Sequence, residues 1–444
     1  MSQRLDRLDL LDRYTRIPTV SREVPPAMVE AVQLFWRGLG LDLEPLLPES
    51  GEGTPVLFGE VPGPAGAPTL LLYGHYDVQP TGDPARWIWN DVACDPFVPA
   101  YFLDGAPVDP ATLASHDLDR VQMVARGGCD NKGQHMANIF GVLDAARAGT
   151  LLWTVKILLD GEEEHGSPHL RAICERYRDR VMTDLLIGSD GPKPRNQPAL
   201  LMGVRGLLGV NIVAENGQRA SVHSGNYGNI VPNPVLPLAR LVAEIEQRVR
   251  DYADEHDTFR REAADRFAEW ADRATWKPFL WPTVNINHLI TDGASPNLTR
   301  TIIPRSAHAR LDVRLTPDTP PAAVIGIIES TVAAHQDAME GISFSVRCDG
   351  MPASYTSPDH PAFDWLLALL AELGDGDPVA LPILGGTLPN FVFTDVLGIP
   401  SFWLPAANAD NQQHDINEHY VLKHFYLQTR LYERIVSTLP GEVA

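Results

Sequence analysis

Short apolar runs and amphipathic segments alternate along the first half of the chain. Residues 69–73, 155–159 and 184–187 are short and mostly apolar, which predicts three buried strands. Residues 132–148 place their apolar side chains on one face, which predicts a helix. A second helix is predicted to start at Ser167, with the serine as its cap and a proline at its first position. This order predicts an α/β sheet with helices on both faces.

The pattern changes after residue 205. Residues 207–215 predict an exposed antiparallel strand, and residues 283–288 and 307–315 predict two more. In the last of these, apolar and polar side chains alternate throughout. Residues 237–276 are long, charged and helical in pattern. These elements predict a separate α+β domain.

The α/β character returns in the last part of the chain. A strand is predicted at residues 401–404 and a closing helix at residues 420–439. A chain of 444 residues is too long for one ordinary core, so two domains are expected. The simplest division is a discontinuous catalytic domain, residues 1–205 and 385–444, with residues 206–384 inserted.

Charge and composition exclude several classes of protein. The formal net charge of −21 argues against a nucleic-acid partner or an anionic membrane surface. No run approaches about 18 apolar residues, so no membrane span is predicted. Residues 1–21 predict an amphipathic surface helix rather than a signal peptide. The four cysteines lack paired spacing, which predicts reduced, buried thiols in a cytoplasmic protein.

Two adjacent acidic residues, Glu163 and Glu164, follow one of the predicted strands. Neighbouring buried carboxylates repel each other, and a metal cluster offsets that repulsion. One carboxylate then binds metal and the other is free to act as a base. His75 follows another strand and can bind a metal, while Asp77 can accept its other ring N–H.

Three more candidate ligands lie at similar positions. Asp130 precedes the helix at residues 132–148, Asp190 ends the third strand, and His414 follows the strand at 401–404. Each is also compatible with a cap, a turn or a structural histidine when taken alone. Together, two histidines and three carboxylates suit a pair of zinc-like ions with one bridging carboxylate.

These motifs resemble a known family, the dinuclear zinc peptidases that include carnosinase, the aminoacylases, acetylornithine deacetylase and bacterial glutamate carboxypeptidase. The resemblance covers nearly the whole chain and is strongest for the carnosinase branch. It rests on residues 73–80, 129–133, 163–167, 189–190, 222–228 and 414–418. It implies a twisted, mostly parallel sheet with an inserted lid domain that also forms a homodimer.

The resemblance also implies roles for the candidate ligands. One divalent ion, most often zinc in this family, would be bound by His75, Asp130 and Asp190. A second would be bound by Asp130, Glu164 and His414, with Asp130 bridging. The general base would be Glu163, and Asp77 would orient His75. A cis peptide bond after Asp130 is implied as well.

The remaining implied residues contact the substrate. His223 would reach the partner subunit's active site and stabilise the oxyanion, and Arg314 would bind the substrate carboxylate. Thr301, Gly386 and Thr387 fall where the carnosinase branch contacts substrate, although Thr387 replaces a more usual serine. Arg314 is equally compatible with a solvated strand position. Residues 101–120 form an insertion, for which a surface loop is the default expectation.

Several functions remain open at this point. The first is a metal-dependent dipeptidase or small-peptide carboxypeptidase, in which Glu163 activates a water. The second uses the same residues to cleave an N-acyl or N-carbamoyl group from an amino acid. The carnosinase-like motifs favour the first. A non-catalytic metal-binding paralogue is disfavoured because every implied ligand is present. Zinc, manganese and cobalt all suit such ligands.

Overall fold

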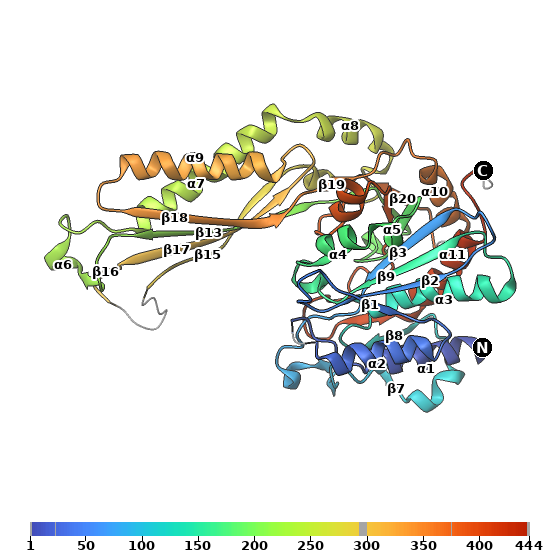
Figure 1. The fold of residues 1–444 in the computed structure, drawn as a ribbon. Coiled ribbons are helices and arrows are strands. Elements are labelled where there is room, and N and C mark those ends of the chain that lie inside the picture. Colours follow the sequence, from blue (N-terminus) through green and yellow to red (C-terminus); the bar gives the residue numbers. More distant parts are fainter. Residues whose placement is uncertain (1, 23, 293–299, 374, 442–444) are drawn as a thin grey trace.

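An eight-stranded sheet forms the centre of the larger part of the molecule (Figure 1). The computed structural model describes residues 2–22, 24–292, 300–373 and 375–441. Four strands of this sheet lie side by side and parallel, in the order β9 (Thr154–Asp160), β3 (Thr69–His75), β10 (Leu185–Gly188) and β21 (Ser401–Trp403). All four were predicted from the apolar runs. Because they are parallel, their carboxyl ends meet at one edge, where α/β proteins place their sites.

Four further strands complete the large sheet. Strand β2 pairs antiparallel with β9 and β1, and β11 pairs antiparallel with β21 and parallel with β20. Their bounds are β1 (Glu44–Leu46), β2 (Val56–Val61), β11 (Ala199–Leu201) and β20 (Val379–Leu381). The sheet is therefore mixed at its margins and parallel at its centre, as expected for this fold class.

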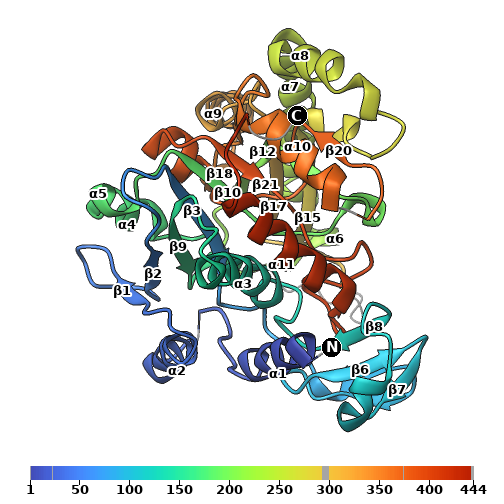
Figure 2. The same cartoon turned by 90° about the vertical axis from the view of Figure 1, so that its right-hand side faces the viewer.

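Helices cover both faces of the large sheet (Figure 2). Helices α3 (Lys132–Ala148) and α11 (Leu422–Val436) pack against each other on one face, and α4 (Leu170–Arg176) and α5 (Arg178–Val181) lie on the other. A Cβ at Gly141 would stand 2.5 Å from the backbone nitrogen of Glu433, so this glycine permits the close approach of α3 and α11. The other helices here are α1 (Ser2–Thr15), α2 (Pro26–Arg37) and α10 (Ala362–Leu373).

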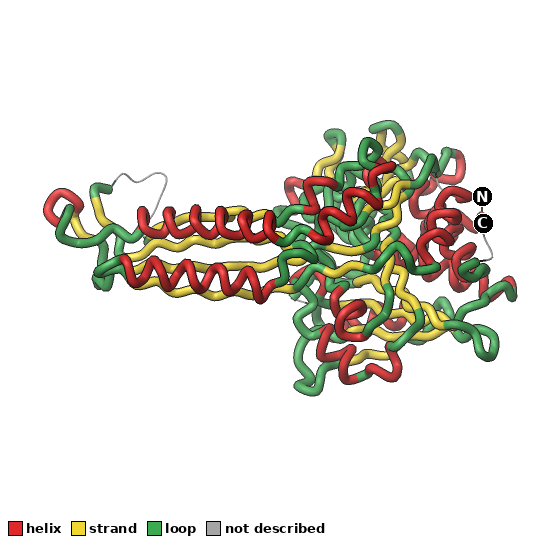
Figure 3. Tube along the Cα trace, turned by 90° about the horizontal axis from the view of Figure 1, so that it is seen from above, coloured by secondary structure: helices red, strands yellow, loops and turns green. Residues whose placement is uncertain are grey.

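A second, four-stranded antiparallel sheet extends away from the large one (Figure 1). Its order is β15 (Thr283–Thr291), β17 (Ser306–Leu315), β13 (Gly206–Glu215) and β18 (Ser343–Met351). Helices α7 (Val235–Glu255) and α9 (Pro321–Ala338) lie side by side over one face (Figure 3). These six elements are called the arm below. They have a hydrophobic core of their own.

The arm confirms one strand prediction and corrects another. In β17, the apolar positions alternate and are buried as predicted, namely Ala307, Ala309, Leu311 and Val313. Strand β13 was expected to be exposed, but it pairs with β17 on one side and β18 on the other. It is therefore an interior strand of the sheet, and its alternate side chains are buried.

Residues 237–276, whose pattern is helical, form more than one helix. Helix α7 ends at Glu255 and α8 (Thr258–Arg266) follows, with 3-10 turns after it. Phe267 and Trp276 are fully buried in the core of the larger part. Elements of the large sheet also resume at β20, before residue 385. The division of the chain into domains at residues 205 and 385 stays a prediction.

Two local expectations were wrong. Residues 101–120 were expected to form a surface loop but contribute a β-hairpin to a small sheet ordered β22-β8-β6-β7, with a 3-10 turn at Pro110–Ser115. Its strands are β6 (Ala100–Leu103), β7 (Ala106–Val108), β8 (Val121–Val124) and β22 (His419–Val421). Ser167 does not cap a helix, because its hydroxyl donates to Asp160 Oδ2 at 2.7 Å and α4 begins only at Leu170.

The remaining expectations concern thiols and membranes. All four cysteines are free. Cys94, Cys129 and Cys174 are buried as predicted, whereas Cys348 on strand β18 is only half-buried. Within the described ranges, every helix is too short or too polar to cross a bilayer.

Candidate metal centre

His75 is the last residue of β3, at the carboxyl edge of the large sheet. Its side chain is fully buried. Ring atom Nδ1 lies 3.0 Å from the backbone oxygen of Asp77, which favours a proton on Nδ1. The lone pair of Nε2 is then free to bind a cation.

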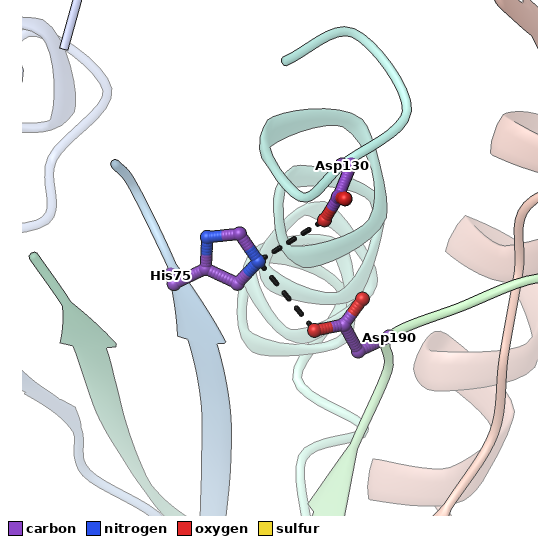
Figure 4. Close-up of side chains that lie close together, drawn as sticks. All are labelled: His75, Asp130 and Asp190. Atoms are coloured by element: carbon purple, nitrogen blue, oxygen red, sulfur yellow. Dashed lines mark hydrogen bonds and ion pairs between the residues drawn. The ribbon is translucent and has the colours of Figure 1, made fainter. Parts of the chain in front are cut away.

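Asp130 lies in the loop between β8 and α3, and one of its carboxylate oxygens faces the ring of His75 (Figure 4). Oδ1 is 3.2 Å from His75 Nε2, and Oδ2 is 3.2 Å from His414 Nε2. Asp190 Oδ2 lies 3.5 Å from the same nitrogen of His75, and Glu164 Oε2 lies 3.4 Å from that of His414. Asp130 is thus shared by two groups of ligand atoms.

These two groups have the composition of metal sites. One consists of His75, Asp130 and Asp190, the other of Asp130, Glu164 and His414, and within each group the ligand atoms lie within 4.8 Å of one another. Neutral imidazole and carboxylate are the ligands that zinc and similar divalent ions take. The five residues are called the metal-ligand cluster below. The structure brings together all five residues that the sequence singled out.

The electrostatics of the cluster fit bound cations. Burial raises the pKa of the Glu163 carboxyl well above its ordinary value, and the charges of Asp190, Glu164 and Asp77 add to this effect. Burial and the charge of Asp130 likewise raise the pKa of the Glu164 carboxyl well above its ordinary value. So many acids in one buried place repel each other unless positive charge lies between them. Two divalent ions would supply that charge, so the residues present suit them.

Glu163 and Glu164 occupy a short 3-10 turn, Glu163–His165, just beyond the end of β9. The turn is held by Asp77, whose Oδ1 and Oδ2 accept the backbone N–H groups of Glu163 and Glu164, both at 3.2 Å. From the sequence, the Asp77 carboxylate was expected to accept the other ring N–H of His75. It lies 3.4 Å from Nδ1, but the backbone carbonyl is nearer. Asp77 therefore links the histidine to the glutamate turn.

His414 differs from the other ligands in its exposure and backbone. Its side chain is 60% exposed, whereas the side chain of Asp130 is 5% exposed. Its φ of 64° lies in the left-handed region, which is uncommon outside glycine. This backbone conformation is part of what aims the ring at Asp130. The exposed side of the cluster is consequently the His414 side.

A cleft of about 920 Å³ opens beside the cluster. Asp130, Glu163, Asp190 and His414 line one part of it, and Arg314, Gly386 and Thr387 line another. Arg314 lies on β17 and donates from Nη1 to Thr387 Oγ1 at 2.9 Å, while Nε pairs with Asp312 at 3.2 Å. Of the five residues outside the cluster that were predicted to contact the substrate, these three thus share a cavity with it.

Thr301 and His223 do not lie at this cleft. His223 ends β14 (Val222–His223), which pairs with β16 (Ile302–Ile303) directly after Thr301. The two side chains approach each other at 3.5 Å, between Thr301 Oγ1 and His223 Nε2. Figure 1 shows β16 and α6 (Ser224–Tyr227) at the far tip of the arm. Within one chain, neither residue can contact the cluster.

Sequence reasoning assigned no role to a buried glutamate that holds the Asp130 loop. Glu418 is fully buried, and its two carboxylate oxygens accept from the backbone N–H groups of Gly127, Cys129 and Asp130 at 2.9–3.0 Å. Arg126 donates to the same carboxylate. Glu418 belongs to the recognised motif at residues 414–418, which was the signal available in the sequence, but the motif did not indicate that its partners are residues 127–130. The peptide bond between Asp130 and Asn131 is cis.

Two other residues support the glutamate turn. Gln79 donates from Nε2 to Glu164 Oε2 at 2.8 Å, and its backbone N–H donates to Oε1 at 3.1 Å. Asp160, the last residue of β9, accepts from Tyr73 and from the backbone of Glu162. Burial and the charge of Asp77 raise the pKa of Asp160 to about 6. Gln79 belongs to the recognised motif at residues 73–80, and this motif was the feature of the sequence that could have identified it.

Comparison with known proteins places this geometry among metallopeptidases. The chain is 25% identical over 472 residues to the Cys-Gly metallodipeptidase dug1 of Schizosaccharomyces pombe, covering 95% of this chain and 93% of that protein. It is 26% identical over 313 residues to the probable di- and tripeptidase DUG2 of Saccharomyces cerevisiae. That match covers 64% of this chain but only 32% of DUG2.

A solved structure and a family model agree with these matches. The M20 family metallo-carboxypeptidase Sso-CP2 of Sulfolobus solfataricus superposes with a TM-score of 0.78 at 23% identity, covering 97% of this chain and 98% of that one. The model of peptidase family M20/M25/M40 matches residues 71–438, which is well over half of the chain. The matched range contains the whole metal-ligand cluster. This chain therefore belongs to peptidase family M20/M25/M40.

Proposed function

We propose that the chain hydrolyses the peptide bond of dipeptides or small peptides with a free carboxylate, with the help of two divalent metal ions. The observation that carries the proposal is the position of Asp130, whose two oxygens face two separate groups of ligands. A carboxylate shared in this way suits a pair of ions rather than one. Zinc is the proposed metal, because two histidines and three carboxylates fit its preferences.

The ions would be held by the five cluster residues, with Asp130 common to both sites. Bound metal ions polarise a carbonyl group and lower the pKa of water so that it becomes a nucleophile near neutral pH. Among the acidic residues that line the cleft, Glu163 is the one outside the two ligand groups. Its carboxylate is proposed to accept the proton from the attacking water. The same group then delivers a proton to the leaving amine.

Arg314 is proposed to bind the free carboxylate of the substrate. It lines the same cleft as Glu163, and its guanidinium is oriented by Thr387 on one side and Asp312 on the other. A guanidinium held in one orientation can donate two parallel hydrogen bonds to a carboxylate. Gly386, beside Thr387, leaves the cleft open at this point.

A homodimer formed through the arm is the proposed assembly. Strand β15 is an edge strand, and it exposes Ile286 (56%), Leu289 (41%) and Ile290 (51%). An apolar, unpaired edge of this kind favours pairing with another strand. A second copy of the chain on this edge would cover it. His223 and Thr301, which lie away from the cluster of their own chain, are proposed to complete the site of the partner and to stabilise the oxyanion.

The relatives favour a peptide substrate over an N-acyl amino acid. Dug1 is named a Cys-Gly metallodipeptidase, and it aligns with nearly the full length of this chain. The deacylase alternative has no comparable support. The free cysteines favour a cytoplasmic location, because such thiols persist in a reducing compartment.

The test is hydrolysis of a dipeptide library and of N-acetyl amino acids by the purified protein loaded with zinc or manganese. We expect dipeptide cleavage that EDTA abolishes. Glu163→Gln should retain both metals, measured by elemental analysis, and lose activity by several orders of magnitude. If the protein released amino acids only from N-acetyl amino acids and cleaved no dipeptide, its function would be that of a deacylase. Near-normal kcat in Glu163→Gln would remove this residue as the base.

A further inference from the structure

Apolar residues lie beside Arg314 on one wall of the cleft. Strand register places Arg314 of β17 directly opposite Leu207 of β13, and Leu207 directly opposite Met351 of β18. Residues opposite each other on neighbouring strands point to the same face of a sheet. All three line the cleft. On this face of the sheet, therefore, Arg314, Leu207 and Met351 lie next to each other on three adjacent strands.

A second apolar group approaches Arg314 from another direction. Phe279 lies in the short turn η6 (Lys277–Leu280), and its ring covers Gly385. A Cβ on Gly385 would lie 3.0 Å from Cζ of this ring, so a larger residue there would require the ring to shift by a small amount. Two residues farther on, Thr387 accepts the hydrogen bond from Arg314. Phe279 is thus adjacent to the loop that orients the guanidinium.

The same cleft wall continues through residues next to Gly385. Leu384 precedes it and is half-buried, and Leu388 follows Thr387. Both line the cleft together with Phe279. The acidic residues in the lining belong to the metal-ligand cluster and Glu163, away from this loop in the chain. The cleft wall beside Arg314 is therefore largely apolar, and the other basic residues of the lining, Lys193 and Arg195, lie on the segment that follows Asp190.

We propose that the substrates carry a bulky apolar side chain on their C-terminal residue, and that Phe279 and Leu207 select it. This inference rests on the proposed dipeptidase function, with Arg314 holding the free carboxylate. In an amino acid the carboxylate and the side chain share one Cα, so the side chain must lie beside Arg314. An apolar side chain loses water there at no cost, whereas a charged one would lose hydration without a compensating partner.

The experiment measures kcat/KM of the wild-type enzyme for Gly-Phe, Gly-Leu, Gly-Gly, Gly-Asp and Phe-Gly. We expect Gly-Phe and Gly-Leu to exceed Gly-Gly by about 10- to 100-fold, with Gly-Asp at or below Gly-Gly. Phe-Gly should not share this advantage. The wild-type comparison needs no altered residue, so its result does not depend on whether a variant folds.

Variants then assign the preference to Phe279. Phe279→Ala should lower kcat/KM for Gly-Phe by about 10-fold and leave Gly-Gly within about 2-fold, while Phe279→Leu should retain most of the preference. Phe363→Ala is the matched control. This half-buried ring packs on Phe267 and Trp270 and does not line the cleft, so the Gly-Phe to Gly-Gly ratio should not change.

Two results would overturn the inference while leaving the dipeptidase function intact. One is an equal kcat/KM for all C-terminal residues, and the other is a preference for Phe-Gly over Gly-Phe. An unchanged ratio in Phe279→Ala would remove Phe279 as the selecting residue. Failure to cleave any dipeptide is a distinct outcome, which would overturn the proposed function and the inference together.

Discussion

Arg126 and Glu418 form a buried ion pair, with Arg126 Nη1 2.7 Å from Glu418 Oε2. The side chains are 2% and 0% exposed. Arg126 also donates to the backbone oxygens of Pro80 and Asp415, at 3.2 and 3.0 Å. Pro80 belongs to the loop after His75, and Asp415 follows His414 directly. One arginine thus joins the three loops that carry His75, Asp130 and His414.

Glu418→Gln should weaken metal binding. An amide has one acceptor oxygen, so its NH₂ group would face backbone N–H donors that a carboxylate now satisfies. Loss of such supporting contacts lowers metal affinity by about 10- to 100-fold in other metal sites. Calorimetric titration of the metal-free protein with zinc measures the effect. Glu255→Gln, at an exposed position at the end of α7, should bind zinc like the wild type. Equal affinities in both variants would contradict the role of Glu418.

A mixture of two inactive variants should regain activity if His223 acts across a dimer. His223→Ala and Glu163→Gln should each be inactive as homodimers. In a mixed dimer, the chain that retains Glu163 would receive the intact His223 of its partner, so one of two sites is complete. Random reassembly of equal amounts should therefore restore about a quarter of the wild-type activity.

The control for this experiment mixes Glu163→Gln with Glu164→Gln. Both changes lie in the same turn, so no combination of the two chains contains a complete site. Activity restored in this mixture would show that subunit exchange is not the cause. The absence of activity in the first mixture would place His223 outside the partner's site.

Arg314→Met should remove the preference for a free carboxylate. The wild type is expected to cleave a dipeptide faster than the same dipeptide with a C-terminal amide, because only the former has a charge for the guanidinium. Losing this contact should raise KM for the dipeptide by about 10- to 100-fold. The variant should then cleave the dipeptide and its C-terminal amide with similar kcat/KM. Arg314→Lys should recover only part of the difference, since lysine cannot donate in a fork. A wild-type enzyme that cleaves both substrates equally would contradict the assignment.

His424 should make the protein less stable in acid. It is buried, and Lys193 Nζ lies 3.2 Å from its Nδ1. Burial lowers the pKa of His424 from 6.5 to about 3, and the charges of Lys193 and Lys423 add to this effect. Between these two values the unfolded chain binds a proton at this histidine and the folded chain does not. The free energy of unfolding should therefore fall as the pH drops from 6.5 towards 3, by about 1.4 kcal/mol per pH unit.

The variant His424→Gln isolates this contribution. It cannot take up the proton, so its free energy of unfolding should decrease less steeply than that of the wild type between pH 6.5 and about 4.5. Urea unfolding of the metal-free proteins at both pH values gives the difference. His256→Gln, at an exposed position, is the control and should keep the wild-type slope. Identical slopes for wild type and His424→Gln would contradict the prediction.

The sequence allowed the central sheet and the metal-ligand cluster to be predicted because both depend on local patterns. His75 and Asp190 stand at the ends of apolar strands, and parallel strands bring such ends together. Asp130 precedes the helix α3, whose pattern was equally clear. The grouping of His414 with Asp130 needed the family resemblance, since 284 residues separate them.

Other features depend on contacts that no local pattern shows. The hairpin β6-β7 is short, and its small sheet is completed by β22, far along the chain. Ser167 had the signature of a helix cap, but its hydroxyl donates to Asp160 and its φ is 49°. In each case a tertiary contact overrides the local preference.

The position of Glu418 has a consequence for the order in which the protein matures during translation. The backbone of Asp130 is held by a residue made 288 positions later. At common rates of synthesis, roughly 15–60 s pass between the two. During that interval the nascent chain already contains His75, Asp130 and the glutamate turn, but the Glu418 contacts that hold the backbone of Asp130 do not yet exist. Metal acquisition should therefore come at the end of synthesis, and any chain that stops before residue 418 should fail to acquire metal.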